Sequence, residues 1–465
     1  MLRRFIAYYK PHKKLFILDM LASFCVSLIG IVYPIVTRNM LNDYIPNKNY
    51  QAIVFFGMTL LLLYFVRMLL RYFIQYEGHM MGIRMQAAMR RDLFNHLEKL
   101  PYSFYDEHET GKIMSRMTND LMEVSELAHH GPENIIISSI SILTSFVYLS
   151  MINLPLTLIV FSCVPVLFFI SMNLRKRMRE ASAKSRKAIA SINGAVESSI
   201  SGIRVTKAFT NAKKELEKFE IGNEEYAEAR RDSYKAMGQF HSSTAFITDV
   251  FNVIVLIAGG LFLYAGSISF GDYSAFIVSV GMFITPVTTL INFVEQYQNG
   301  ATGFERFIEI LDTPAEQDKE GAVDLTSVQG EIEFRNVTYR YDEDKEVLNN
   351  INLKVEQGKT FALVGPSGGG KTTICHLIPN FYEVLQGQIF IDGKDIATIT
   401  KDSLRKQIGI VQQDVYLFNA SIKLALSSKS PFHPFFMSKS CEIPISFNLL
   451  NSPSNASPTA RIASS

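Results

Sequence analysis

Cysteine is scarce in this sequence of 465 residues, and the four that occur are far apart. They form neither a CxxC pair nor a cluster with histidine, so the sequence predicts reduced packing residues and indicates no zinc site or redox centre. The cysteines are Cys25, Cys163, Cys375 and Cys441. An excess of one charge is also lacking, because 46 Lys and Arg oppose 44 Asp and Glu for a net charge of +2. Without a strong positive field, nucleic acid is not expected as a partner.

Apolar residues are abundant, at 48% of the chain, and they are concentrated before about Val294 in blocks that charged stretches separate. This composition excludes a disordered chain, and the length allows more than one domain. Each block is near the ~20 residues that a bilayer core requires, so we predict an all-α transmembrane domain over residues 1–314 with six spans. The predicted spans cover about 15–36, 52–74, 135–151, 154–172, 246–265 and 273–293.

Basic residues predict how these spans are oriented. Arg3, Arg4 and Lys10 precede the first span, which is too long for a cleavable signal peptide, so the positive-inside rule places the N-terminus in the cytoplasm. The two long connections, 75–134 and 173–245, then lie inside and are also basic and helix-forming. We expect helical stalks there, in a multi-pass protein of the cytoplasmic membrane with both termini in the cytoplasm.

Four ionisable residues fall inside the predicted spans: Asp19, Arg67, Arg71 and Asp249. Such residues are costly in a membrane and normally face a cavity or a partner. All four lie toward the cytoplasmic halves of their spans, so we predict that they snorkel to the interface, and they assign no substrate.

After Gly303 the sequence changes to short alternating stretches punctuated by glycine. This texture predicts a soluble α/β domain with strands, beginning at residue 330 after a polar linker over 315–329. The predicted strands lie at 330–339, 351–355, 361–364 and 388–393.

A phosphate-binding loop stands out in this region, because residues 365–372 fit the pattern GxxxxGK[ST]. The pattern lies between the predicted strand 361–364 and a predicted helix over 373–378, which favours nucleotide binding over an ordinary glycine-rich turn. Its backbone N–H groups would surround the phosphates, Lys371 would reach the β- and γ-phosphates, and Thr372 would offer its hydroxyl to Mg²⁺. The predicted binding residues here are Gly365, Pro366, Ser367, Gly368, Gly369, Gly370, Lys371, Thr372 and Thr373.

Over residues 1–423 the chain resembles a bacterial half-size exporter of the ATP-binding cassette (ABC) superfamily, of the multidrug or lipid type. The segment Ile408–Phe418 looks like the family's Q-loop, and Tyr341 looks like its adenine-stacking aromatic. The resemblance implies that Gln413 binds Mg²⁺ and senses the γ-phosphate. A solvated turn at Gln413 and simple strand packing at Tyr341 remain the alternatives.

The resemblance also implies cofactors and partners. The cofactors are ATP and Mg²⁺. The partners are the lipid membrane, a second half-transporter in a homodimer or heterodimer, and a hydrophobic drug or lipid substrate. Segments 104–120 and 202–215 resemble the family's cytoplasmic loops, whose short tip helices dock into the nucleotide domains.

The family pattern stops after Lys423. The partial nucleotide-binding domain, 330–423, lacks the LSGGQ signature, the strand ending in Asp-Glu and the switch histidine, and residues 424–465 predict an aberrant disordered tail. Phosphoryl transfer needs a positioned water and a charge clamp, so we assign no catalytic residue and do not expect hydrolysis. A frameshift or an assembly error near Lys423 would produce this C-terminus.

Three functions remain open from the sequence. The first is an ATP-driven exporter subunit that couples ATP binding and hydrolysis to export of a hydrophobic substrate. The second is a truncated ATP-binding membrane protein without transport activity, either a remnant or a regulatory subunit. The third is a channel or receptor that senses nucleotide without pumping.

Overall fold

The computed structural model describes residues 1–341, 346–366 and 368–411. It divides into two compact units, each with its own core. The first unit comprises Met1–Asn95 and Ile113–Asp312, and the second comprises His96–Lys112 and the described residues from Thr313 onward.

The first unit is entirely helical. Six of its helical stretches are long and apolar enough to cross a membrane, which confirms the predicted six-helix transmembrane domain and makes the chain a multi-pass membrane protein. The long helices are α2 (Lys13–Asn39), α3 (Tyr50–Phe73), α7 (Leu121–Ile152), α8 (Leu154–Ser201), α10 (Ala212–Tyr264) and α11 (Phe270–Asp312). The shorter elements are α1 (Leu2–Ala7), η1 (Lys10–His12), η2 (Met40–Tyr44), η3 (Ile74–Gly78), α4 (His79–Leu97), α6 (Thr110–Ser115), η4 (Arg116–Asp120) and α9 (Ile203–Ala208).

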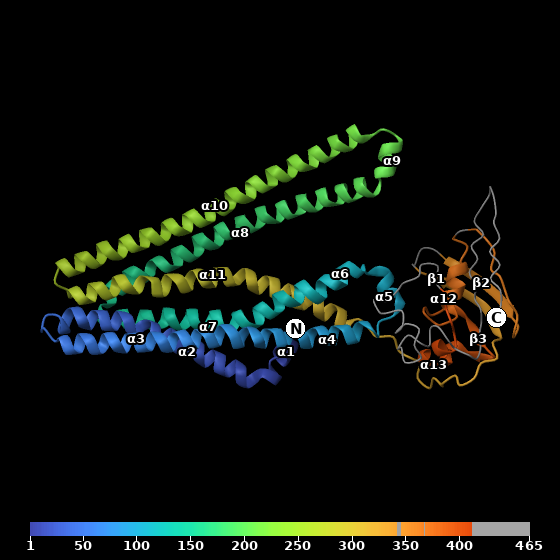
Figure 1. The fold of residues 1–465 in the computed structure, drawn as a ribbon, viewed down its shortest axis with the longest axis horizontal. Helices are drawn as coiled ribbons and strands as arrows, with labels where there is room; N and C mark the ends of the chain where they lie inside the picture. The colour runs from blue at the N-terminus through green and yellow to red at the C-terminus, as the bar shows by residue number, and fades with distance from the viewer. Residues whose placement is uncertain (342–345, 367, 412–465) are drawn as a thin grey trace, which may run out of the picture. The chain divides into compact units, whose positions relative to one another are not determined.

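Two groups of helices make up this unit. Helix α8 packs along α10, and α7 packs along both α11 and α2. Helix α2 also contacts α3. Figure 1 shows α8 and α10 diverging from the other helices toward their shared tip at α9. At the opposite end the groups share a core of interlocking aromatic and aliphatic side chains, in which Phe251 and Phe283 are almost fully buried. The predicted stalks are therefore continuous helical extensions of the spans.

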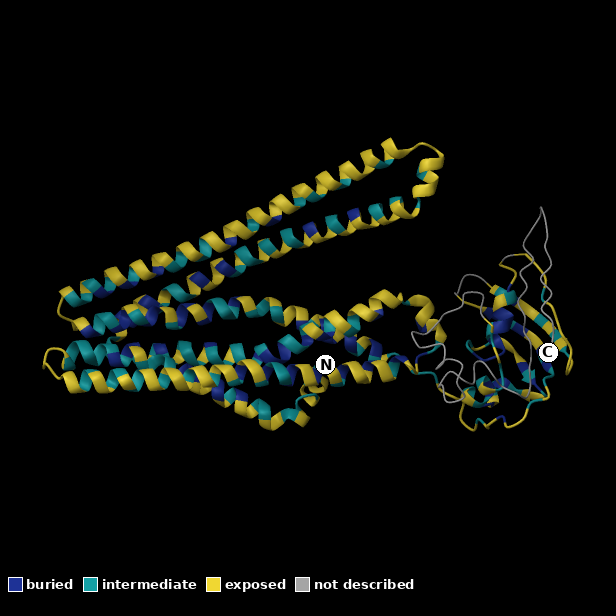
Figure 2. Ribbon diagram, viewed as in Figure 1, coloured by how far each residue is buried: buried dark blue, intermediate teal, exposed yellow. Residues whose placement is uncertain are grey.

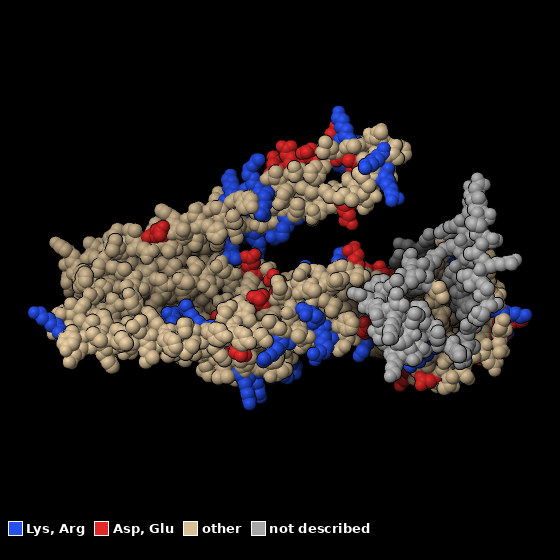
Figure 3. Space-filling view, in the orientation of Figure 1, with Lys and Arg blue, Asp and Glu red and all other residues tan. Residues whose placement is uncertain are grey.

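The surface of the spans is apolar. The most hydrophobic stretch of α3 has none of its residues buried, and Phe55, Leu61 and Phe65 are exposed large side chains on it. Exposed faces also run along α8 and α10 (Figure 2). Lys, Arg, Asp and Glu are sparse at the end of the unit remote from α9 (Figure 3). A broad exposed apolar surface without charge is what lipid or a partner subunit covers.

The second unit contains a four-stranded antiparallel sheet in the order β2-β1-β3-β4. The strands are β1 (Ile332–Arg340), β2 (Glu346–Val355), β3 (Gln386–Ile391) and β4 (Lys394–Asp395), and the other elements are α5 (Tyr102–Glu107), α12 (Lys371–Leu377), η5 (Ile396–Thr398) and α13 (Lys401–Lys406). Alternate residues of β1 face the core, where Ile332 and Phe334 meet Ile389 and Ile391. The partial α/β fold predicted for this region is confirmed.

The predicted strand at 361–364 is wrong, since these residues have no regular secondary structure. Phe361 is half exposed and Val364 is 92% exposed. A strand forms only where a neighbouring strand accepts its backbone hydrogen bonds, and no strand among the described residues pairs with this segment. The other three predicted strands correspond to β1, β2 and β3, and the predicted helix corresponds to α12.

Candidate functional site

The phosphate loop leads directly into α12, as its sequence predicts. The described loop residues from Gly365 to Gly369 are exposed, so their backbone is accessible to a ligand. The Nζ of Lys371 donates hydrogen bonds to the carbonyl oxygens of Gly365 and Pro366, at 2.9 and 2.8 Å. The Lys371 side chain therefore folds back over the loop. If a nucleotide bound there, its phosphate oxygens could accept these hydrogen bonds in place of the two carbonyl oxygens.

Glycine is required at the last position of the loop. Gly370 has a φ of +79°, in the left-handed region, and is the N-cap of α12. A Cβ at this position would lie 2.5 Å from Cδ2 of Leu348, a buried side chain of β2. The loop can therefore turn into the helix close to β2 only without a side chain at this position.

Two of the predicted binding residues meet beside the loop. The hydroxyl of Tyr341 lies 3.3 Å from the Oγ1 of Thr373, which is buried in the first turn of α12. The Tyr341 side chain itself is 47% exposed, so it has surface left for a ligand. Thr372, the next residue along α12, is exposed. The structure thus brings Tyr341, Lys371, Thr372 and Thr373 to one edge of the second unit.

Two other predicted binding residues, Ser367 and Gln413, lie outside the described residues, as do the predicted tail and Cys441. The remaining cysteines are free, and Cys375 is buried as a packing residue would be, whereas Cys25 is exposed. Burial raises the pKa of Cys375 in α12 to about 11, which keeps this thiol protonated and unreactive.

Within the second unit, the short helix α5 packs against the segment that follows α12. The rings of Tyr102 and Phe381 stack with centroids 4.0 Å apart. The hydroxyl of Tyr382 donates a 2.7 Å hydrogen bond to Asp106. Burial and this hydrogen bond raise the pKa of Tyr382 above its usual value. Helix α5 belongs to the first predicted cytoplasmic loop, so this loop contacts the domain that carries the phosphate loop. No pattern in the sequence predicted the role of Phe381 and Tyr382, the two aromatic residues that contact α5.

Glu316, in the predicted linker, forms ion pairs with α13 and so holds the linker against the domain that follows it. Arg405 donates two hydrogen bonds to its carboxylate, at 2.8 and 2.6 Å, and Lys401 lies 3.5 Å away. Burial raises the pKa of Glu316, but the hydrogen bonds and charges of the two cations lower it by more, so the pKa lies below its usual value.

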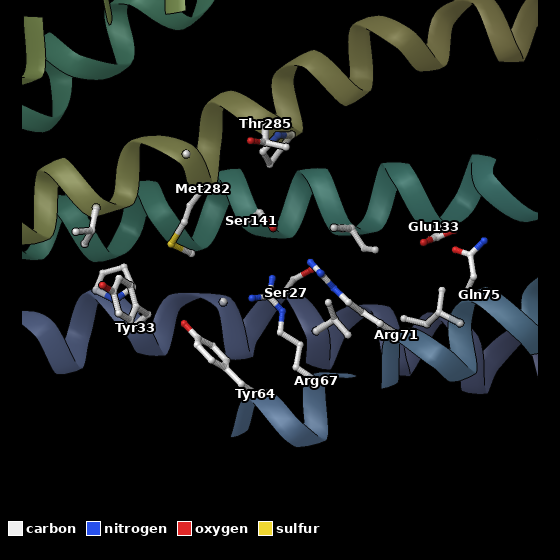
Figure 4. Close-up of a pocket in the computed structure, with 18 residues that line it drawn as sticks. Ser27, Tyr33, Tyr64, Arg67, Arg71, Gln75, Glu133, Ser141, Met282 and Thr285 are labelled. Atoms are coloured by element: carbon white, nitrogen blue, oxygen red, sulfur yellow. The ribbon is translucent and has the colours of Figure 1, made fainter. Parts of the chain in front are cut away.

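A cavity of 640 Å³ lies among the membrane helices of the first unit. Its lining comes from α2, α3, η3, α7 and α11, and Figure 4 shows Arg67 and Arg71 of α3 pointing into it. The Nε atom of Arg67 is buried and has no hydrogen-bond partner among the described residues. Snorkelling is therefore the wrong prediction for Arg67, which faces this cavity, whereas Arg71 lines the cavity but is exposed.

Asp19 also departs from the prediction. It is fully buried on α2, and its Oδ2 lies 3.8 Å from Nδ1 of His129 on α7. His129 belongs to a cluster with His79 and His130, in which one ring nitrogen from each lies within 4.8 Å of the others. Sequence spacing missed this cluster, because its members come from helices separated along the chain.

Known proteins share the features of both units. The family model described as "ABC transporter transmembrane region" matches residues 16–287, and the model described as "ABC transporter" matches residues 348–436. The chain is 37% identical to the uncharacterized ABC transporter ATP-binding protein YwjA of Bacillus subtilis, over 91% of this chain and 74% of that protein. It is 31% identical to an ATP-dependent lipid A-core flippase of Albidiferax ferrireducens, over 90% of this chain and 72% of that protein. It is 29% identical to the putative multidrug export ATP-binding/permease protein YgaD of Bacillus subtilis, over 92% of this chain and 76% of that protein.

These matches agree with the architecture described above. A half-size exporter implies dimerisation and a membrane setting, and an ABC ATPase domain implies ATP binding. With its six membrane helices and its phosphate loop in one polypeptide, the chain belongs to the ABC transporter family, as a bacterial exporter that joins a transmembrane region to a nucleotide-binding domain.

Proposed function

We propose that this chain is one half of an ATP-driven exporter that moves a hydrophobic substrate with an anionic group, such as a lipid, across the cytoplasmic membrane. The observation that carries this proposal is the cavity among the membrane helices. Two arginines and one carboxylate, Glu133, are the charged side chains that line it. The balance is positive, and a guanidinium in apolar surroundings favours a phosphate or carboxylate partner.

The remaining lining suits the rest of an amphiphile. Val26, Ile74 and Met282 offer apolar contacts, and the hydroxyls of Tyr33 and Tyr64 offer hydrogen bonds. One relative is named a lipid A-core flippase and another a putative multidrug export protein, and these names agree with a hydrophobic substrate. An anionic lipid would place its headgroup at Arg67 and Arg71 and its chains against the apolar helices.

For the energy source, we propose that MgATP binds at the phosphate loop. Lys371 would contact the β- and γ-phosphates, Thr372 and Gln413 would hold Mg²⁺, and Tyr341 would stack on adenine. Support comes from the folded-back position of Lys371 and from the exposed faces of Thr372 and Tyr341. A second half-transporter would complete the dimer, with both termini of each chain in the cytoplasm.

The test is lipid transport by the purified full chain in proteoliposomes. Fluorescent phosphatidylglycerol and phosphatidylcholine are compared with and without MgATP. The matched variants are Arg67→Gln with Arg71→Gln in the cavity and Arg186→Gln on the exposed stalk surface of α8. We expect ATP-dependent movement of phosphatidylglycerol that the cavity variant reduces at least about tenfold, as loss of a charge-assisted contact implies. The stalk variant should behave as the wild type.

Three outcomes would count against parts of the proposal. Equal transport of both lipids, unaffected by the cavity variant, would contradict the anionic substrate. Lipid movement that does not depend on ATP would contradict the pump and favour a channel. ATP binding without movement of any substrate would favour the alternative, an ATP-binding membrane protein without transport activity.

A further inference from the structure

Three histidines gather beside Asp19, at the ends of the predicted spans that face the cytoplasm in the proposed orientation. His79 is the first residue of α4, and His129 and His130 lie in α7. Their ring centroids are 4.6 to 5.0 Å apart, and one ring nitrogen from each lies within 4.8 Å of the others. Imidazole nitrogens brought this close together are the usual donors for Zn²⁺ and similar transition metals.

The protonation of His79 suits a metal ligand. Its Nδ1 lies 2.7 Å from the backbone carbonyl oxygen of Gln75. A carbonyl only accepts hydrogen bonds, so Nδ1 carries the proton in the neutral ring and Nε2 presents its lone pair. A histidine that donates one N–H to a carbonyl and binds a metal through the other nitrogen is the common arrangement in metal sites.

His129 is the most deeply buried member of the cluster, with 2% of its side chain exposed. Neither ring nitrogen has a hydrogen-bond partner among the described residues, and neither carboxylate oxygen of Asp19 has one. Leaving four such atoms unpaired inside a protein is costly. A cation bound at Nε2 would satisfy the ring and leave Nδ1–H directed at Asp19, 3.8 Å away.

Glu133 supplies the fourth donor of the cluster. Its Oε2 lies 3.1 Å from Nδ1 of His130 and 3.5 Å from Nε2 of His129. Two ligand atoms of a tetrahedral zinc ion, each about 2.0–2.1 Å from the metal, are about 3.3–3.4 Å apart. The Glu133 carboxylate therefore lies from each of the two imidazoles at about the separation that two ligands of one ion have, and the histidine nitrogens, within 4.8 Å of one another, would have to move closer together.

The backbone of η3 makes room for the buried ring. A Cβ at Gly78 would lie 1.8 Å from Cε1 of His129. The ring can therefore occupy its position only because residue 78 is glycine. Single π-helical turns such as η3 often lie at functional sites, and this one ends directly before His79.

We propose that His79, His129, His130 and Glu133 bind one divalent transition-metal ion of the Zn²⁺ class, with Asp19 orienting His129 from behind. The ion would join α4 to α7, and through Asp19 it would also restrain α2. Glu133 and Gln75 also line the cavity, so the ion would lie at one end of the proposed substrate site. The metal proposal does not depend on transport or on nucleotide binding.

The experiment measures Zn²⁺ on the full chain, purified in detergent with a tag that contains no histidine. After removal of metal with a chelator, Zn²⁺ is added and bound metal is determined by equilibrium dialysis and elemental analysis. We expect one high-affinity ion per chain. X-ray absorption of the zinc-loaded wild type should show only nitrogen and oxygen ligands at about 2.0–2.1 Å, with the scattering pattern of imidazole.

Variants then locate the ion. His79→Gln should weaken Zn²⁺ binding at least about 100-fold, and Asp19→Asn should weaken it about 10–100-fold, as loss of an outer partner does. His241→Gln, an exposed histidine of α10 outside the cluster, is the matched control and should bind as the wild type does. Gly78→Ala removes no donor but displaces the His129 ring, so it should also weaken binding.

Either of two results would overturn the proposal. One is a wild-type chain that holds no stoichiometric Zn²⁺, or one whose absorption spectrum lacks imidazole ligands. The other is unchanged Zn²⁺ affinity in His79→Gln and Gly78→Ala. The spectrum of the wild type decides the question even where a variant fails to fold. Loss of Zn²⁺ binding with ATP-dependent transport intact would leave the proposed exporter function standing.

Discussion

Replacement of Arg405 by methionine should lower the stability of the whole second unit, because this arginine connects the linker to the domain through several hydrogen bonds. Its guanidinium donates two hydrogen bonds to Glu316 and further bonds to the carbonyl oxygens of Pro379 and Asn380, at 3.2 and 3.0 Å. It also lies 5.2 Å above the ring of Phe381. Methionine keeps much of the side-chain volume and removes every one of these polar contacts.

The expected loss of stability in Arg405→Met can be estimated from the burial of the Arg405–Glu316 ion pair. The side chains of Arg405 and Glu316 are 27% and 17% exposed. A hydrogen bond to a charged group contributes about 1.5–3 kcal/mol when buried, whereas an exposed ion pair contributes about 0–1 kcal/mol. Partial exposure and the remaining charge of Lys401 reduce the loss, so we expect about 2 kcal/mol less stability. This corresponds to roughly a 30-fold larger population of the open domain.

Hydrogen exchange of the chain in lipid nanodiscs, followed by mass spectrometry, measures this opening. Amides of β1 should exchange about 30-fold faster in Arg405→Met than in the wild type. The matched control is Lys354→Met, which removes an exposed ion pair with Glu331 and should leave exchange nearly unchanged. Equal exchange rates in the two variants would refute the argument that the Arg405 contacts hold the domain together.

The effect should also depend on pH, because the pKa of Glu316 is lowered in the folded chain. The ion pair contributes its full stability above the unfolded pKa of about 4.3, and this contribution is lost as the pH falls through the folded pKa. The difference between the wild type and Arg405→Met should therefore be constant near neutral pH and shrink below about pH 4. A difference that grows on acidification would contradict the assignment.

Three further substitutions test other parts of the second unit. Gly370→Ala forces a left-handed φ on alanine and should weaken binding of a fluorescent ATP analogue about tenfold, whereas Gly409→Ala, in open space, should not. Tyr382→Phe removes the hydrogen bond to Asp106 and should speed amide exchange in α5 about fivefold, while an unchanged rate would contradict a stabilising contact. Phe334→Ala empties a core position that is 2% exposed and should lower the stability of the domain by about 3–5 kcal/mol, measured by denaturant unfolding.

Local sequence patterns predicted the membrane helices and the phosphate loop. Each span is a continuous apolar block, and the loop from Gly365 to Thr372 carries its signal in adjacent residues. Both features depend on neighbours in the chain, and for that reason they could be placed without a structure. The strand at 361–364 could not, because a strand also depends on a partner that the segment itself does not contain.

The direction in which polar side chains point inside the bundle was also not predictable from the sequence. Position along a span places Asp19 and Arg67 near one end of the membrane, but it does not say which way the helix faces. Packing of α2 against α7 turns Asp19 toward His129, and the rotation of α3 turns Arg67 into the cavity. The histidine cluster was missed for the same reason, since His79 and His129 come together only when α4 and α7 are placed in three dimensions.

Nucleotide binding and turnover by the purified chain test the central claim most directly. The chain is reconstituted in lipid, and the affinity for an ATP analogue and the rate of ATP turnover are measured for the wild type and for Lys371→Ala. The phosphate loop predicts binding of the analogue that Lys371→Ala abolishes, and equal binding by the wild type and the variant would contradict nucleotide binding there. Because residues 330–423 lack the signature, the Asp-Glu strand and the switch histidine, turnover decides between the proposed ATP-driven exporter half, which requires it, and an ATP-binding membrane protein without transport activity.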